Sequence, residues 1–110
     1  MKIKKIKKPW GYELLFAHTK DYVGKILVIQ KNEELSLQYH EQKEESIYVA
    51  QGKLEVEIGD ETLVLNRGQN LHIPPGTRHR FKALEACEVF EVSTPYLEDV
   101  VRLRDRYGRV

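Results

Sequence analysis

Short apolar segments separated by turn residues are the feature that most constrains the fold of this chain. Between residues 25 and 93, runs of Val, Ile and Leu alternate with Gly, Pro, Asp and Asn, and no helical period occurs before Leu97. Many short strands at such spacing are typical of an all-β barrel or sandwich. We expect strands at 25–30, 46–51, 53–58, 61–65, 70–73, 80–84 and 88–93.

The two ends of the chain carry other patterns. Residues 1–8 are rich in lysine, which predicts either a charged edge strand or a frayed terminus. The tail from Leu97 to Arg106 is expected to form a short amphipathic helix, because Val100, Leu103 and Tyr107 recur at helical spacing.

Length, charge and cysteine content narrow the class of protein. The 110 residues suffice for one domain, 1–110, with its own core, but not for two. The formal net charge of +1 gives no reason to expect a nucleic acid or a membrane as partner. The single cysteine, Cys87, excludes an intramolecular disulfide. No apolar run is long enough to span a bilayer or to form a signal region, so we expect a soluble protein of the cytoplasm.

Two polar segments, 36–52 and 68–79, carry side chains that suit a metal ion. Gln38 and His40 are two residues apart, so on a strand they point to the same face. Glu45 follows after a short turn and can reach the same point, and His79 follows a Pro-Gly turn. Such nitrogen and oxygen donors bind transition metals. They predict one divalent ion, with Zn²⁺ as first choice and Mn²⁺, Co²⁺, Fe²⁺ or Ni²⁺ as alternatives. The competing interpretation is a set of polar residues on a solvent-facing strand.

The same residues resemble the two sequence motifs of the cupin superfamily. Motif one, H-x-H-x(3,4)-E-x6-G, is matched by His40, Glu45 and Gly52, with Gln38 in the first His position. Motif two, G-x5-P-x-G-x2-H-x3-N, is matched by Gly68, Pro74, Gly76 and His79, with Ala83 in place of the final Asn. The resemblance implies the cupin double-stranded β-helix, a jelly-roll barrel, with Gln38, His40, Glu45 and His79 as the metal ligands.

A narrower resemblance covers nearly the whole chain. It is to the C-terminal isomerase domain of type II mannose-6-phosphate isomerase/mannose-1-phosphate guanylyltransferase, at residues 8–11, 35–40, 73–80 and 99–109. Gln38 stands where the general cupin motif has its first His, and that family has the same replacement. Two pairs differ from the family, because Glu41-Gln42 replaces a His-rich run and Ser46-Ile47 replaces a His-Trp pair. No nucleotidyltransferase segment precedes the motifs, so we expect that activity to be absent.

The resemblance implies isomerisation of mannose 6-phosphate to fructose 6-phosphate, in carbohydrate metabolism. This reaction needs a base that carries a proton between C1 and C2 of the sugar. Glu91, on an apolar late strand that could face the barrel interior, is the first candidate, and Glu44 is the second. The competing interpretation places Glu91 on the outer face of the sheet.

A sugar phosphate as small-molecule partner also needs cations. Lys25 matches a lysine of the family, and Arg78 and Arg80 flank His79, where an arginine fork could bind phosphate. The competing interpretation for all three is that they are solvated surface cations. The run 102–109 is interpreted as a salt-bridged tail, and its family match makes a role at the mouth of the site conceivable.

Two other functions stay open at this stage. One is a non-catalytic, metal-containing cupin that binds a sugar or another small polar ligand. The other is a different metal-cupin enzyme, such as a dioxygenase. Fold alone does not decide among them. The family resemblance also leads us to expect a homodimer, paired through edge strands.

Overall fold

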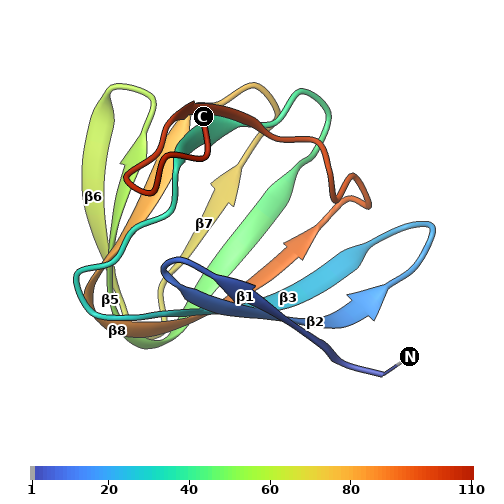
Figure 1. Cartoon of the computed structure of the whole chain (residues 1–110), viewed down its shortest axis with the longest axis horizontal. Coiled ribbons are helices and arrows are strands. Elements are labelled where there is room, and N and C mark those ends of the chain that lie inside the picture. The colour runs from blue at the N-terminus through green and yellow to red at the C-terminus, as the bar shows by residue number, and fades with distance from the viewer. Residues whose placement is uncertain (1) are drawn as a thin grey trace.

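The protein, here a computed structural model, is described for residues 2–110, and every regular element in that range is a β-strand (Figure 1). The strands are β1 (Lys4–Lys8), β2 (Gly11–His18), β3 (Val23–Ile29), β4 (Leu37–Tyr39), β5 (Glu45–Ile58), β6 (Glu61–Asn66), β7 (Asn70–Ile73), β8 (His79–Ser93) and β9 (Val101–Arg104). Met1, the first residue of the basic segment 1–8, lies outside the described residues. The predicted all-β class is confirmed.

All strand pairs are antiparallel, and the sheet curls around a common interior. One path through it has the order β1-β2-β3-β8-β4-β9, while β5 pairs with β6, β7 and β8. The long strand β8 belongs to both sides of the molecule, because it pairs with β4 at His79 and with β3 from Cys87 to Ser93. This curled antiparallel sheet is consistent with the expected jelly roll.

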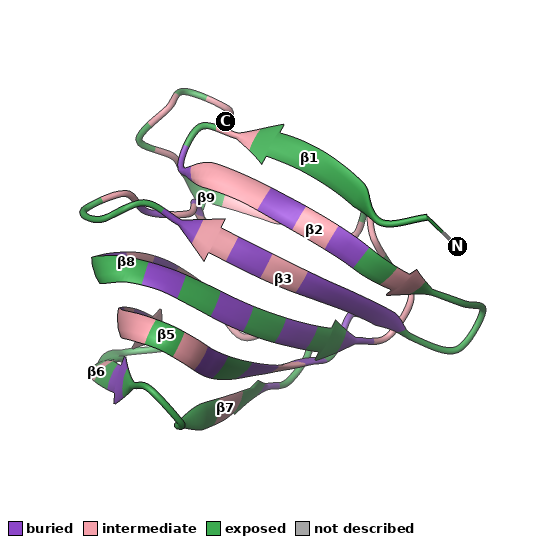
Figure 2. Cartoon of the chain, turned by 90° about the horizontal axis from the view of Figure 1, so that it is seen from below, coloured by how far each residue is buried: buried purple, intermediate pink, exposed green. Residues whose placement is uncertain are grey.

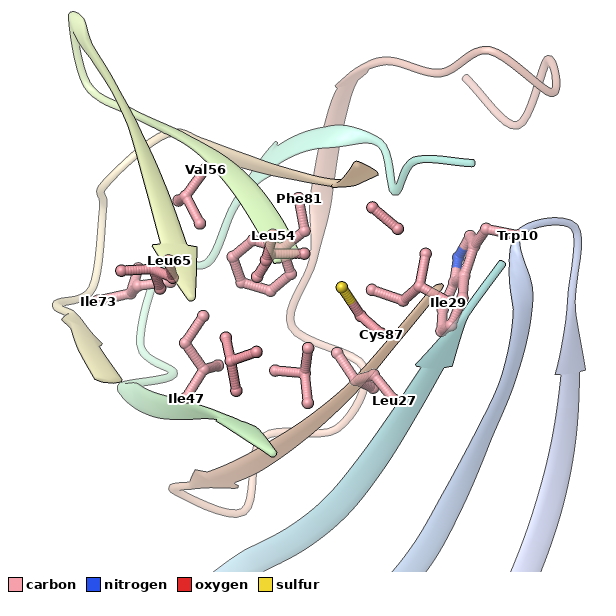
Figure 3. Packing of buried hydrophobic residues seen from close by; sticks show 13 residues of the cluster. Trp10, Leu27, Ile29, Ile47, Leu54, Val56, Leu65, Ile73, Phe81 and Cys87 are labelled. Atoms are coloured by element: carbon pink, nitrogen blue, oxygen red, sulfur yellow. The ribbon is translucent and has the colours of Figure 1, made fainter. Parts of the chain in front are cut away.

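Alternation along the strands separates the core from the surface. In β8, Phe81, Ala83 and Val89 are buried while Phe90 and Val92 are exposed, and Figure 2 shows this alternation as bands along the strand. The buried apolar residues form one cluster (Figure 3), made up of Trp10, Leu27, Ile29, Ile47, Val49, Leu54, Val56, Leu65, Ile73, Phe81, Ala83, Cys87 and Val89. The alternation of residues along the strands therefore matches the alternation between the buried and the exposed face of the sheet.

Two pairs of predicted strands are joined in the structure. The segments 46–51 and 53–58 form the single strand β5, which continues through Gly52 with a shift in register. Gly52 has a φ of +87°, and a Cβ on it would lie 2.1 Å from the carbonyl oxygen of Ala86. Glycine thus allows a bulge here instead of a strand end. The segments 80–84 and 88–93 likewise form β8, and β2 was not predicted.

The predicted C-terminal helix is wrong. Part of the segment 97–106 forms β9, which pairs with β4 through Gln38↔Arg102 and Tyr39↔Val101. A helix of this length is marginal in water, whereas β9 pairs with backbone groups along one side of β4. Tyr107, one of the residues at helical spacing, instead packs against the core.

In the part of the chain that the structure describes, no helix is long and apolar enough to cross a membrane.

Candidate metal centre

Strand ends bring the predicted ligands together. His40 directly follows β4, Glu45 begins β5 and His79 begins β8. Because β8 pairs with β4 at Gln38↔His79 and with β5, the two sequence motifs meet inside the curled sheet. The structure therefore brings together residues that lie up to 41 positions apart in the sequence.

His40, Glu45 and His79 form a buried cluster. Their potential ligand atoms all lie within 4.8 Å of one another. The Nε2 atom of His40 is 3.8 Å from Oε2 of Glu45, and Nε2 of His79 is 3.4 Å from Oε1 of Glu45. The three side chains are at most 5% exposed.

Backbone carbonyls orient both imidazole rings. Nδ1 of His40 lies 2.6 Å from the carbonyl oxygen of Asp99, and Nδ1 of His79 lies 2.9 Å from that of Thr77. Because a carbonyl oxygen only accepts, each Nδ1 carries the proton and each Nε2 keeps a lone pair. Neither Nε2 has a hydrogen-bond partner within residues 2–110. Buried lone pairs that converge on a carboxylate are what a divalent cation needs, so these residues fit a metal ion.

Gln38 lines the same cavity as the cluster. Its Oε1 accepts a hydrogen bond of 2.8 Å from the hydroxyl of Ser36. To serve as a fourth ligand, this amide oxygen would have to bind a cation while it accepts the Ser36 hydrogen bond, or give that bond up.

The structure adds Lys43, which the sequence did not single out. Its ammonium group lies 3.1 Å from Oε2 of Glu45 and 3.0 Å from Oε2 of Glu91, and the side chain is 7% exposed. In the sequence, Lys43 lies in the turn between the predicted ligands His40 and Glu45, and this position was the available signal. Lysine is, however, mostly a surface residue. Lys43 thus connects the His–Glu–His cluster to Glu91. Glu91 faces the interior, as the first of the two interpretations of this residue expected.

Burial and charge shift the pKa values of these groups. Burial alone would raise the pKa of Glu45, but the nearby His79, Lys43 and His40 outweigh it and lower that pKa to about 2. Burial, and then the charge of Glu45, raise the pKa of Glu91. Burial lowers the pKa of His40 against the attraction of Glu45. A neutral imidazole and an ionised carboxylate are the protonation states that metal ligation requires.

The carboxylate of Asp99 holds the turn that follows His40. It accepts hydrogen bonds from the backbone N–H groups of Glu41, Gln42 and Lys43, at 3.0, 2.7 and 2.9 Å. These donors lower the pKa of Asp99. Since the Asp99 carbonyl also accepts from His40, one residue of the C-terminal segment fixes both a potential ligand and the turn after it.

A cavity of about 90 Å³ adjoins the cluster. It is lined by Lys8, Trp10, Glu13, Lys25, Leu27, Leu35, Ser36, Gln38, His40, Lys43, Glu45, Phe81, Glu91, Leu97, Val100, Arg102 and Arg109. Lys25, a predicted phosphate ligand, thus lies in the cavity, where its Nζ donates to Oε2 of Glu13 at 3.3 Å. The C-terminal run 102–109 contributes Arg102 and Arg109 to this lining. A role of this run at the opening of the site is what the family match suggested.

Three other predicted residues lie elsewhere. Arg78 is exposed and does not line this cavity, and Arg80 points away from it, paired with Glu34 and Glu57. Residues next to an inward-facing one on a strand point outward, which explains the position of Arg80 beside His79. Glu44, the second candidate base, is exposed and pairs with His72 on the surface.

A family model described as "Cupin domain" matches residues 25–93. Among curated proteins, the xanthan biosynthesis protein XanB of Xanthomonas campestris pv. campestris (strain B100) is 35% identical over 96% of this chain and 24% of its own length. The mannose-1-phosphate guanylyltransferase ManC of Salmonella typhimurium is 33% identical over 97% of this chain and 23% of its own. The polyketide synthase CurC of Streptomyces cyaneus is 38% identical over 68% of this chain and half of its own length. The chain spans about a quarter of XanB and of ManC.

Solved structures show the same fold. KdgF from Halomonas sp. superposes with a TM-score of 0.76 and 26% identity, over 86% of this chain and 88% of that one. A putative sugar phosphate isomerase from Acidithiobacillus ferrooxidans gives a TM-score of 0.62 with 17% identity, over 67% of this chain and 50% of that one.

Proposed function

The chain belongs to the cupin family, and from that premise we propose that it is a metal-dependent sugar-phosphate isomerase that interconverts mannose 6-phosphate and fructose 6-phosphate. One observation carries the proposal: a buried His–Glu–His cluster with two free Nε2 atoms lies beside a second buried carboxylate, Glu91, in a cavity lined by lysines and arginines. ManC, whose name describes an enzyme of a mannose phosphate, supports the substrate class.

His40, Glu45 and His79 would hold the cation, with Gln38 as fourth ligand. Two imidazoles and a carboxylate suit Zn²⁺ first, and other divalent transition metals after it. When bound, the cation would polarise the substrate carbonyl and stabilise negative charge on the substrate oxygens.

Glu91 acts as the general base. It removes the proton from C2 of the aldose and returns it to C1, while the proton of the C2 hydroxyl moves to the oxygen on C1. Burial raises the pKa of Glu91, which makes the carboxylate a stronger base than an exposed one. Lys43, 3.0 Å from Glu91, keeps that carboxylate in position and balances its charge.

The polarity of the cavity favours this function over the alternatives. Lys8, Lys25, Lys43, Arg102 and Arg109 all line it. Cations suit the phosphate group of a sugar phosphate, whereas an apolar lining would have favoured other cupin chemistry.

An assay for fructose 6-phosphate formation from mannose 6-phosphate tests the proposal. Turnover should occur with added divalent metal and stop after treatment with a chelator. Glu91→Gln should lower kcat by about 10²–10⁴-fold, the contribution of a general base, while the bound metal content stays the same.

The matched control is Glu88→Gln, because Glu88 lies on the same strand but is exposed on the outside. Its kcat should equal that of the unmodified protein. If no divalent metal supports turnover, the isomerase proposal fails. Binding of mannose 6-phosphate without turnover would then point to the non-catalytic, sugar-binding alternative.

A further inference from the structure

Besides Lys43, four cationic side chains line the cavity. Lys8 ends β1, Lys25 lies on β3, Arg102 lies on β9 and Arg109 lies in the tail. Three of the four lie outside the segment 25–93 that matches the family model. Both ends of the chain therefore contribute cations to the cavity, although they are about one hundred residues apart in the sequence.

These cations are only partly neutralised by the carboxylates that contact them. Oε2 of Glu13 lies 3.3 Å from Nζ of Lys25, and its Oε1 lies 3.9 Å from Nζ of Lys8. Asp105 binds Arg109 through both carboxylate oxygens, at 2.8 Å each. Among the described residues, two carboxylates thus contact three of the four cations.

Arg102 differs from the other three cations in having no carboxylate partner among residues 2–110. Its Nε is buried and has no hydrogen-bond partner among residues 2–110, and no carboxylate in that range forms an ion pair with it. A buried guanidinium N–H without an acceptor is unfavourable, so an external acceptor would stabilise this side chain.

Repulsion between Lys8 and the other cations also favours a bound anion. Burial lowers the pKa of Lys8, and the charges of Lys25, Arg102 and Arg109 lower it further against the attraction of Glu13. Lys8 is therefore repelled by the other three cations. A bound dianion would relieve this repulsion.

We propose that Lys8, Lys25, Arg102 and Arg109 form a binding subsite for a phosphate monoester. A phosphate has a charge near −2 and several acceptor oxygens, which match four cations with several N–H donors better than a single carboxylate does. Asp105 accepts from Nε and Nη2 of Arg109 and so holds this guanidinium in place, which leaves Nη1 for the phosphate and reduces the side-chain freedom lost on binding.

The subsite adds a phosphate-binding part to the proposed function. The identity of the rest of the ligand rests on that proposed function. The same cavity is lined by His40, Glu45 and Glu91. A phosphate held by the two chain ends would direct the remainder of a small molecule toward these three residues. Arg78 and Arg80, which the sequence suggested for this task, lie outside the cavity.

Titration calorimetry of the full chain with inorganic phosphate, both metal-loaded and chelator-treated, tests the subsite. Arg102→Gln and Lys8→Gln should each weaken phosphate binding about tenfold, as expected for one lost charge-assisted contact. Lys8 is partly exposed, so its variant keeps the test valid if Arg102→Gln does not fold. Arg67→Gln is the matched control, because Arg67 is an exposed arginine in the turn between β6 and β7.

Acetate serves as the carboxylate probe and should bind at least tenfold more weakly than phosphate. The subsite is refuted if phosphate does not bind, if acetate binds equally well, or if Arg67→Gln loses as much affinity as the other two variants. Phosphate binding is measured without turnover, so an inactive protein that still binds phosphate through Arg102 and Lys8 would contradict only the isomerase function.

Discussion

Both imidazoles of the candidate metal centre are oriented by backbone carbonyls instead of side chains. His40 donates to the carbonyl of Asp99, and His79 donates to the carbonyl of Thr77. A side-chain substitution at Asp99 or Thr77 does not remove such an acceptor. The orientation of each ring therefore depends on the path of the chain, and the side chains that fix this path become the sensitive positions.

Lys43 is the residue on which the metal-free cluster depends most. We expect Lys43→Met to destabilise the metal-free protein by about 3–5 kcal/mol, because it leaves Glu45 and Glu91 as buried carboxylates without their shared cation. Added Zn²⁺ should restore part of the loss, since it replaces the positive charge beside Glu45. Thermal unfolding with and without Zn²⁺ measures both effects.

The control for this prediction is Lys31→Met, at an exposed lysine. Its Tm should change little and should not depend more on Zn²⁺ than that of the unmodified protein. An unchanged Tm for metal-free Lys43→Met would show that the lysine does not neutralise the two carboxylates.

Asp105 gives a prediction for the dependence of stability on pH. Its hydrogen bonds from Arg109 lower the pKa of Asp105 to about 2, against an ordinary value of 3.8. A lowered pKa in the folded protein means that the ionised pair stabilises the fold above about pH 4 and that this contribution is lost as the pH falls from about 4 to about 2.

We therefore expect Asp105→Asn to lower the free energy of unfolding by about 0.5–1 kcal/mol at pH 7, the usual range for a partly exposed ion pair. Denaturant unfolding of both proteins at several pH values between 2 and 7 measures the difference. The gap should close at the acidic end, and a gap that is constant across this range would contradict the assignment.

At the scale of whole elements, the strands of the core could be predicted because one face of each is buried. The segments 61–65 and 70–73 appear as β6 and β7 with nearly the expected bounds. The joining of two segments into β5 could not be predicted, because it depends on the close approach of Gly52 to Ala86. The same holds for β9, whose strand conformation is set by its pairing with β4 and not by local propensity.

The candidate site, too, could be predicted from the sequence only in part. Spacing along one strand and one turn is local, so the sequence could bring His40 and Glu45 to one point, and the second motif could add His79. Contacts such as Lys43 with Glu91, or Arg102 with the cavity, depend on the register of strands far apart in the sequence. They become visible only once the sheet is folded.

The turn between β4 and β5 depends on a residue from the other end of the chain. We expect Asp99→Ala to lower the affinity for Zn²⁺ by about 10–100-fold, the usual effect of losing a group that orients metal ligands. The physical reason is that three backbone N–H groups of the turn lose their shared acceptor, so His40 and Glu45 are held less firmly.

Competition with a chelating dye of known affinity measures this change. Glu98→Ala is the matched control, because Glu98 is an exposed neighbour, and within the described part of the chain the turn's N–H groups bond to Asp99 and not to the Glu98 side chain. Equal affinities for Asp99→Ala and Glu98→Ala would show that the carboxylate does not organise the site.

At the scale of the whole molecule, no other element among residues 2–110 covers one face of the sheet. The outer side of β2, β3, β8 and β5, seen in Figure 2, exposes Phe16, Tyr48, Phe90 and Val92 by 41–58%. They are neighbours, because Tyr48 pairs with Phe90 and Val92 pairs with Gly24, on which the ring of Phe16 lies. Contiguous apolar surface of this kind marks an interaction site.

We propose that a second copy of the chain covers this face. Pairing through the free edge of β1, the other route to a dimer, would bring the lysines at positions 4, 5 and 7 of two copies together, and such like charges repel. Face-to-face packing about a two-fold axis parallel to the strands instead lays Phe90 and Tyr48 near their counterparts.

Light scattering after size exclusion tests this arrangement. The unmodified protein should have twice the 12.9 kDa mass of one chain, and Phe90→Glu should have the mass of one chain because it places charges at the centre of the interface. Val64→Glu is the matched control, since Val64 is equally exposed but lies on β6, away from this face, and should leave the dimer intact. A monomeric unmodified protein would exclude the dimer, and a dimer that survives Phe90→Glu would show that this face is not the interface.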